Sequence, residues 1–204
     1  MRFMYQYNIE PKHYEYLFIQ RGSISAIKDY NKWKIAFDTY HDDLYELIRG
    51  YLPELNKPPS ILEIGSGLGA VSVMLNNHYK GKCHLELIDG KSDDPVVIHH
   101  NETFNNHEVS NDFLNKNGVK NFTLSTPNFQ TETKKDLIVS FSAYCFHIEP
   151  KVYMKLLEKS MKPNTVCIFN IRRSSDYLEQ IRPLFKRIQI IDRWKKGDII
   201  CLEC

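Results

Sequence analysis

Residues 60–69 read Ser-Ile-Leu-Glu-Ile-Gly-Ser-Gly-Leu-Gly, a short apolar run followed by three alternating glycines. The apolar run predicts a buried strand. The glycines predict a tight turn into a helix, because glycine adopts positive φ without strain and lets a ligand lie against the backbone. Twenty residues after Gly69, Asp89 ends a second apolar segment, where a βαβ nucleotide site places the acidic residue that holds ribose hydroxyls. The turn and Asp89 together predict a site for a nucleoside cofactor.

The glycine pattern fits two kinds of cofactor. Gly65-x-Gly67-x-x-Ala70 also satisfies the dinucleotide form G-x-G-x-x-G/A, in which the turn holds a pyrophosphate. A carboxylate at Glu63, just before the glycines, would repel such an anion. The segment resembles motif I of the class I S-adenosylmethionine-dependent methyltransferases, acidic-x-Gly-x-Gly-x-Gly, whose ligand carries a cationic ammonium and sulfonium. The resemblance implies S-adenosyl-L-methionine as cofactor. Pyridine-dinucleotide binding and a turn that binds nothing are the alternatives.

Length and charge limit the classes of function. The chain has 204 residues, enough for one domain with a substantial core and too few for a second catalytic domain. A net charge of +2, from 27 basic and 25 acidic residues, gives no field that would favour nucleic acid as a partner. Five cysteines in or beside apolar segments predict buried thiols rather than a disulfide framework. With no signal peptide or membrane-spanning run, we expect a soluble, cytoplasmic protein without a membrane partner.

Hydrophobic periodicity predicts alternating strands and helices. We expect strands at 60–64, 85–88, 121–125, 137–141 and 166–171, helices at 31–52, 70–78, 108–116, 152–161 and 176–185, and a hairpin of runs 187–191 and 199–204. This alternation predicts an α/β fold with an open, mostly parallel, Rossmann-like sheet, helices on both faces and a C-terminal antiparallel hairpin. The family resemblance implies the seven-stranded methyltransferase fold over roughly residues 58–204.

The first 57 residues are expected to form an aromatic-rich, partly helical cap segment within the same globular domain. Aromatic rings alternate in two short runs there, at residues 3, 5 and 7 and at residues 14, 16 and 18. Such runs are too short to form their own core. They predict either a flap over the active site or a cover for the sheet.

Ligands of open α/β sheets bind beyond the carboxyl ends of the strands, where the strand order reverses. The amide of Asn128 can face an adenine edge and Phe129 can stack on its ring, as in the corresponding family segment, although Thr126-Pro127-Asn128 is also an ordinary turn. The expected cofactor-binding residues are Glu63, Gly65, Ser66, Gly67, Gly69, Asp89, Gly90, Asn128, Phe129 and Ser142.

Residues 140–150, which follow the fourth expected strand, are the second segment of interest. Together with Phe104-Asn105-Asn106, they resemble a subgroup of bacterial and phage methyltransferases described as sugar O-methyltransferases, whose fourth strand runs into a similar aromatic-x-Phe-His turn. Tyr144 and Cys145 stand where that subgroup has tryptophan and a small residue. We expect His147 to act as general base, with a structural histidine as the alternative, and Tyr144 to line the acceptor pocket.

These observations predict a methyltransferase acting on a small-molecule acceptor such as a sugar hydroxyl. The alternatives are an NAD(P)-dependent oxidoreductase and a non-catalytic S-adenosylmethionine-binding partner subunit. Basic residues gather in the last third of the chain, which predicts a solvated face or, alternatively, a nucleic-acid substrate. No metal site is expected, because the histidines at 99, 100 and 107 have irregular spacing and Cys201 and Cys204 would face opposite sides of a strand.

Overall fold

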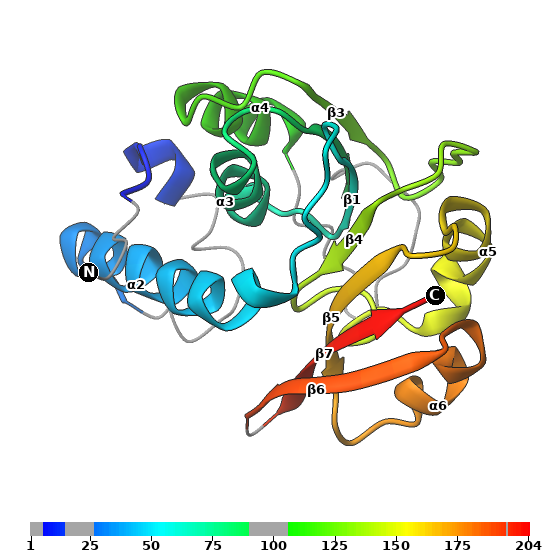
Figure 1. The fold of residues 1–204 in the computed structure, drawn as a ribbon. Helices are drawn as coiled ribbons and strands as arrows, with labels where there is room; N and C mark the ends of the chain where they lie inside the picture. Colours follow the sequence, from blue (N-terminus) through cyan, green and yellow to red (C-terminus); the bar gives the residue numbers. More distant parts are fainter. Residues whose placement is uncertain (1–5, 15–26, 90–105, 195) are drawn as a thin grey trace.

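The computed structural model describes residues 6–14, 27–89, 106–194 and 196–204. A seven-stranded sheet forms its centre, with strand order β3-β2-β1-β4-β5-β7-β6 (Figure 1). The first five strands are parallel and the last two are antiparallel to their neighbours. The strands are β1 (Ser60–Ile64), β2 (His84–Ile88), β3 (Phe122–Ser125), β4 (Leu137–Ser140), β5 (Val166–Arg172), β6 (Arg187–Arg193) and β7 (Gly197–Glu203).

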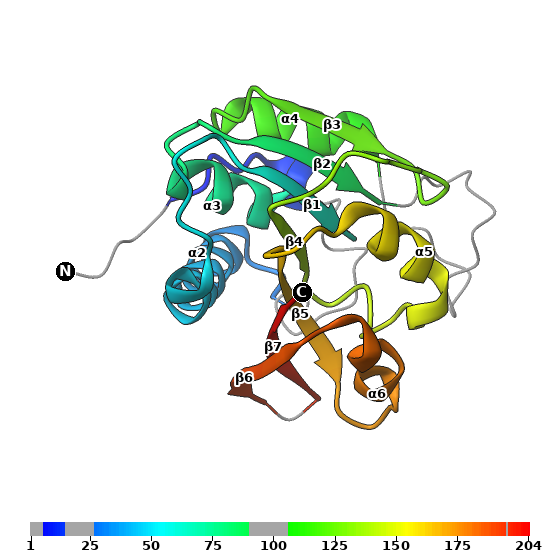
Figure 2. The same cartoon turned by 45° about the vertical axis from the view of Figure 1, so that its right-hand side comes forward.

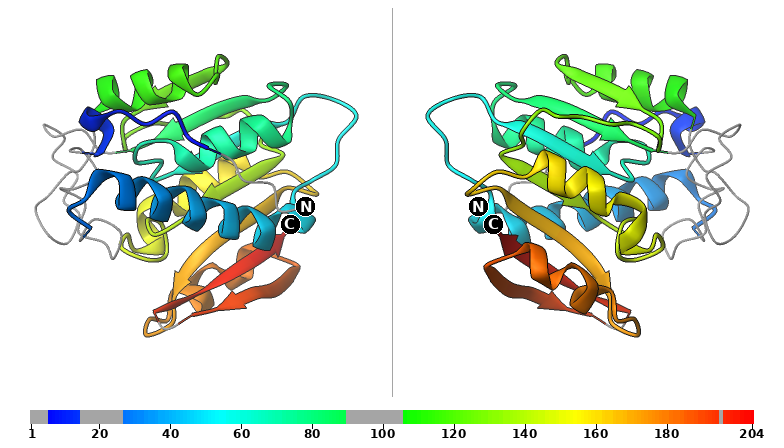
Figure 3. Two further views of the ribbon diagram at one scale, coloured as in Figure 1. Left: turned by 90° about the vertical axis from the view of Figure 1, so that its left-hand side faces the viewer. Right: turned by 90° about the vertical axis from the view of Figure 1, so that its right-hand side faces the viewer.

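Helices cover both faces of the sheet, as Figures 2 and 3 show. The helices α2, α3 and α4 pack on one face, and α5 and α6 pack on the other. The elements are α2 (Tyr30–Ile48), followed by the 3-10 turn η1 (Arg49–Tyr51), α3 (Ala70–His78), α4 (His107–Lys116), α5 (Pro150–Ser160), and α6 (Tyr177–Ile181), followed by η2 (Arg182–Leu184). Residues 11–14 are also helical.

The central strands are apolar on both sides because both sides are covered. In β1, Ile61 faces the cluster under α2, α3 and α4, whereas Leu62 faces the cluster under α5 and α6. The same alternation places Val139 and Ile138 of β4 on opposite faces. Continuous hydrophobic runs in the sequence therefore correspond to strands that are buried on both faces of the sheet.

The predicted fold class is confirmed. Strand and helix bounds differ from the expected ones by a few residues, and the C-terminal hairpin is present. The structure adds the strand order, in which β7 inserts between β5 and β6. Among the described residues, no helix has the length and apolar character needed to cross a membrane.

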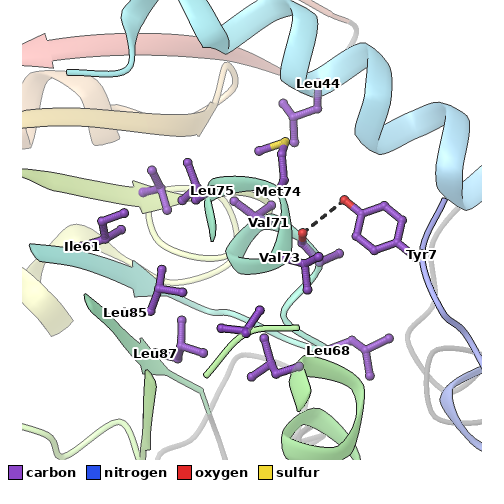
Figure 4. Close-up of a cluster of buried hydrophobic side chains, with 14 of the residues drawn as sticks. Tyr7, Leu44, Ile61, Leu68, Val71, Val73, Met74, Leu75, Leu85 and Leu87 are labelled. Atoms are coloured by element: carbon purple, nitrogen blue, oxygen red, sulfur yellow. Dashed lines mark hydrogen bonds between the residues drawn. The ribbon is translucent and has the colours of Figure 1, made fainter. Parts of the chain in front are cut away.

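Residues 6–14 pack on α2, α3 and α4. Tyr7 is buried, and its hydroxyl donates to Ala70 O at 3.2 Å (Figure 4). Its ring stacks on Phe113 and meets Phe37 edge-on. For Tyr7 this supports the covering interpretation rather than a flap. The rings at residues 3, 5, 16 and 18 lie outside the described residues, as do the stretch 90–105 and with it the predicted site residue Gly90.

Candidate functional site

The glycine turn after β1 is held against the end of β2. The backbone N–H groups of Gly65 and Ser66 donate to Ile88 O at 2.7 and 3.2 Å. Gly65, Gly67 and Gly69 all have positive φ, at 77°, 54° and 97°. Side-chain-bearing residues would be strained in this conformation, which explains the spacing of the three glycines.

Two of these glycines also allow close contacts between elements. A Cβ on Gly65 would overlap the Cβ of Ala143, in the loop after β4. A Cβ on Gly69 would lie 2.7 Å from Leu114 Cδ2, on α4. The turn is therefore enclosed by the β4 loop on one side and by α4 on the other.

Asp89 lies at the centre of this arrangement. Its carboxylate accepts a hydrogen bond from Gly67 N, and its own N–H donates to Ser125 O at 3.1 Å. Ser110 Oγ, on α4, donates to Gly67 O at 2.9 Å. The ends of β1, β2 and β3 and the beginning of α4 thus meet at one place.

Ser66 has a buried hydroxyl that could bind a ligand. The residue is 7 % exposed, and its buried Oγ has no hydrogen-bond partner among the described residues. Buried hydroxyls in native proteins are normally paired with protein, water or ligand. The site offers a hydroxyl on Ser66, a half-buried carboxylate on Asp89 and a glycine backbone that a ligand can approach closely. These groups fit the polar sugar portion of an adenosyl cofactor.

Glu63 behaves differently from the sequence expectation. It is 2 % exposed under α3, where it accepts a hydrogen bond from Ser72 Oγ. Burial, reinforced by the nearby negative charge of Asp89, raises the pKa of Glu63 to about 8, although the Ser72 hydrogen bond opposes this. A raised pKa favours the neutral carboxyl, so repulsion of a pyrophosphate by Glu63 stays a prediction.

The loop after β4 is folded tightly around Ala143. Ser140 Oγ donates to Ile64 O at 2.7 Å and accepts from Tyr144 N at 2.9 Å, which ties the loop to β1. Ser142 and Cys145 both have positive φ, at 56° and 61°. Such backbone conformations persist where surrounding structure imposes them and often mark functional loops. Ser142 is exposed at this edge.

Tyr144 does not line a cleft in this structure. Its side chain is fully buried, and its hydroxyl donates to Pro150 O at 3.0 Å. The ring meets Tyr153 and Phe169 edge-on, with centroids 5.8 and 5.5 Å away. The expectation of an acceptor-lining role is replaced by one of core packing under α5.

His147 is exposed at the same edge, and its Nδ1 lies 3.2 Å from Arg172 Nη2. A guanidinium group only donates, so Nδ1 is the acceptor and the neutral ring carries its proton on Nε2. In this arrangement Arg172 occupies the Nδ1 lone pair, which a general base would use to accept a proton. A general-base role would need Arg172 to move away.

The segment after β3 forms a turn, closed by the hydrogen bond from Phe129 N to Thr126 O at 2.9 Å. Asn128 is exposed there, while Phe129 is half-buried and packs on the hydrophobic cluster under α5 and α6. Both features agree with the ordinary-turn interpretation. A role for either residue at an adenine ring stays a prediction.

Sequence reasoning missed the residues that hold the site together. Ser72, Ser110 and Ser140 bond to residues 9, 43 and 76 positions away, respectively. Of these three serines, only Ser72 lies close in sequence to its partner, because it is in the first turn of the helix that follows Gly69. Arg172 became visible only when β5 and the β4 loop were placed side by side.

A grouping of Glu10, His13 and Asp112 outside this edge has suitable atoms for a metal ion. The ring of the buried His13 uses both nitrogens, because Nδ1 accepts from Glu10 N at 3.0 Å and Nε2 lies 2.9 Å from Asp112 Oδ2. Lys12 and Lys116 form ion pairs with the two carboxylates. The group fits a tether between the N-terminal segment and α4.

A cavity of about 200 Å³, termed the α2 cavity below, lies between α2 and strands β5, β6 and β7. It reaches the β4 loop through Phe141, the residue directly after β4. Its lining residues are Tyr40, Asp43, Leu44, Leu47, Phe141, Asn170, Asp192, Trp194 and Ile199. This cavity could not be predicted from local sequence patterns, because its walls come from five separate segments.

Comparison with known proteins identifies a matching family and solved structures with the same fold. Residues 44–188 match the model of a family described as lysine methyltransferase. No curated protein sequence matches the chain.

Solved structures share the fold at low sequence identity. The T. thermophilus 16S rRNA methyltransferase RsmC, in complex with AdoMet and guanosine, superposes with a TM-score of 0.58 at 16% identity over 79% of this chain. Only 42% of RsmC is covered, so the chain spans less than half of that protein. The precorrin-6y C5,15-methyltransferase of Geobacter metallireducens gives 0.55 at 11% identity, covering 80% of this chain and 88% of that one. The S-adenosylmethionine-dependent methyltransferase SibL gives 0.52 at 9% identity, covering 96% and 70%.

Proposed function

Because the chain belongs to the lysine methyltransferase family, within the class I S-adenosylmethionine-dependent methyltransferases, we propose that it transfers a methyl group from S-adenosylmethionine to an acceptor at the carboxyl edge of its sheet. The observation that carries this proposal is the joint placement of Gly67, Asp89 and the unpartnered hydroxyl of Ser66. These three groups offer a backbone approach, a carboxylate and a hydroxyl at one point, which is the chemistry that an adenosyl cofactor needs.

The bound cofactor supplies an electrophilic methyl group on a sulfonium. The chain's own contribution is to orient the reactants and to exclude water from an in-line displacement. Ser66 and Asp89 would hold the nucleoside, while the β4 loop, anchored through Ser140, forms the wall on the acceptor side. Glu63 is buried close to Asp89, and a cationic ligand nearby would favour its ionised form.

The acceptor that fits best is an amine. An amine reacts through its own lone pair once it is neutral, whereas a hydroxyl needs a base to take its proton. The candidate base, His147, has its Nδ1 occupied by Arg172. This supports the lysine amine named by the family description over a sugar hydroxyl.

A sugar hydroxyl is kept as a second candidate because of the aromatic-x-Phe-His turn at residues 144–147. For that acceptor, His147 would serve as base after release from Arg172. A small-molecule acceptor and the low affinity for nucleic acid inferred from the net charge are predictions. RsmC is an rRNA methyltransferase, so an RNA belongs among the acceptors to be tested.

The test has two stages. Calorimetry with S-adenosylhomocysteine and with NADH establishes the cofactor, and tight binding of NADH without binding of S-adenosylhomocysteine would overturn the proposal. Transfer of labelled methyl groups to lysine peptides, sugars and RNA then establishes the acceptor. His147→Ala should leave transfer to an amine almost unchanged and should slow transfer to a hydroxyl by about a hundredfold or more.

A further inference from the structure

Asn170, one of the residues that line the α2 cavity, has a buried hydrogen-bond acceptor for which the described residues supply no partner. Asn170 is 2 % exposed, and its Oδ1 has no hydrogen-bond partner within the described part of the chain. Its Nδ2 donates to Asp198 O at 3.3 Å. A carbonyl oxygen can only accept, so the amide nitrogen must face Asp198 and Oδ1 is directed away from it. Asn170 Oδ1 is therefore a hydrogen-bond acceptor that a donor group of a ligand could pair with.

The cavity wall carries negative charge, which favours a positively charged hydrogen-bond donor. Asp43 from α2 and Asp192 from β6 both line the cavity, and none of the described residues that line it is basic. The Asp192 carboxylate and the Asn170 amide oxygen are acceptors that suit a ligand with N–H donors and a positive charge, and Asp43 adds a further negative charge to the wall.

Aromatic and aliphatic surfaces complete the wall. The rings of Tyr40, Phe141 and Trp194 line the cavity together with the aliphatic side chains of three further residues, Leu44, Leu47 and Ile199. Aromatic faces attract alkylammonium and guanidinium groups, and aliphatic side chains pack against the methylene stem of such a ligand. The ring of Trp194 stacks on Phe146 with a centroid distance of 5.7 Å, which connects the cavity wall to the β4 loop.

We propose that the α2 cavity is a recognition subsite for a positively charged side chain of the methyl acceptor, an ammonium or guanidinium on an alkyl stem. Its role as part of the acceptor site rests on the proposed function, whereas binding of the cation rests on the cavity alone. Asp192 and Asn170 hold the charged end, Asp43 adds to the negative potential, and Trp194 covers the stem.

The bound group is not the amine that receives the methyl group. Carboxylates beside an amine stabilise its protonated form, and an ammonium has no lone pair with which to attack a methyl group. A cavity built in this way binds a cation and keeps it unreactive. The acceptor is thus expected to carry at least two basic groups, one anchored here and one presented at the cofactor.

The two tryptophans of the chain provide a direct measurement. Trp194 is 38 % exposed at the cavity, whereas Trp33 is 1 % exposed in the core and does not line it. In the full chain labelled with 5-fluorotryptophan, Nα-acetyl-lysine amide should shift the fluorine signal of Trp194 saturably and leave that of Trp33 unchanged. The neutral analogue Nα-acetyl-norleucine amide should cause no saturable shift, and Trp194→Phe assigns the signals.

Variants then test the residues. Asp192→Asn should weaken binding of Nα-acetyl-lysine amide by about fivefold, corresponding to about 1 kcal/mol for a partly exposed charge pair. Asp43→Asn should also weaken it. The matched control is Asp42→Asn, which removes a charge from the neighbouring residue of α2 that does not line the cavity, and its affinity should equal that of the parent protein.

Equal shifts with the lysine and norleucine amides, or an Asp192→Asn affinity equal to that of the parent, would overturn the cation subsite. Calorimetry with S-adenosylhomocysteine on the same samples keeps the two proposals separate. Cofactor binding without a lysine response at Trp194 contradicts the subsite and leaves methyl transfer standing. A lysine response without cofactor binding supports the cation site and contradicts its role in methyl transfer.

Discussion

Ala143 occupies the space that a side chain at Gly65 would need. The Cβ of Ala143, in the β4 loop, lies where a Cβ on Gly65 would point, and Gly65 also has a φ of 77°. The two residues are 78 positions apart in the chain. Their contact joins the cofactor turn after β1 to the loop on the acceptor side.

Replacing Gly65 by alanine should therefore destabilise the protein through both strain and overlap. We expect the free energy of unfolding to fall by about 2–4 kcal/mol, from the cost of a left-handed conformation and of overpacking. Urea denaturation would measure it. Gly50→Ala is the control, because no atom of the described residues outside its chain neighbours lies within 4 Å of a Cβ there, and it should change stability little. Equal stability of the two variants would contradict the contact with Ala143.

Asp89→Asn should weaken binding of S-adenosylhomocysteine by about ten- to thirtyfold. The substitution keeps the size of the side chain but removes a charge that accepts hydrogen bonds from Gly67 N and, when the cofactor binds, from the ribose, at a cost of about 1.5–2 kcal/mol. Calorimetry would measure the affinity. Asp192→Asn, in the α2 cavity, should leave it unaltered, and an Asp89→Asn variant with parental affinity would refute the assignment.

Glu63 should make stability depend on pH. Its pKa of about 8 in the folded protein lies above the ordinary value of 4.5, so the folded state holds the proton more tightly. This contribution to stability is complete below about pH 4.5 and is lost as the pH rises through 8. Glu63→Gln removes the titrating group, so the variant should gain stability relative to the parent protein between pH 5 and pH 8.

Melting temperatures of the two proteins at pH 5, 6, 7 and 8 would test this. Ser72→Ala provides a comparison, because it removes the hydrogen bond that opposes the upward shift of the Glu63 pKa. A constant difference in melting temperature between Glu63→Gln and the parent across this range would show that Glu63 does not titrate there.

Tyr144→Phe should lower stability without affecting methyl transfer. The variant loses the buried hydrogen bond from the Tyr144 hydroxyl to Pro150 O, at a cost of about 0.5–1.5 kcal/mol. Thermal unfolding and the transfer rate would be measured on the same preparation. A loss of activity at unchanged stability would instead restore Tyr144 to the acceptor pocket.

Local patterns predicted most of the fold, because the elements are short and separated by turn residues. The motif at residues 60–69 predicted β1 and α3 and the glycine conformations, and Asp89 was expected beside them. These features depend on neighbours in the chain or on one βαβ unit. The insertion of β7 between β5 and β6 depends on pairing between distant segments and could not be read in advance.

The chemistry of individual side chains was harder to predict, since it depends on burial. Glu63 was expected to be an anion, and its enclosure under α3 raises its pKa. Tyr144 follows a strand end, which suggested a cleft position, yet its ring turns into the core under α5. The pairing of His147 with Arg172 likewise depends on a neighbouring strand.

The bonds that fasten the glycine turn have an energetic consequence for ligand affinity. Ile88 O and the Asp89 carboxylate already restrain residues 65–67 in the free protein. Freezing a flexible loop costs roughly 1–2 kcal/mol per residue in lost backbone freedom. In this protein the backbone entropy of the turn is lost when the chain folds. Ligand binding does not have to order the turn, so more of the interaction energy contributes to affinity.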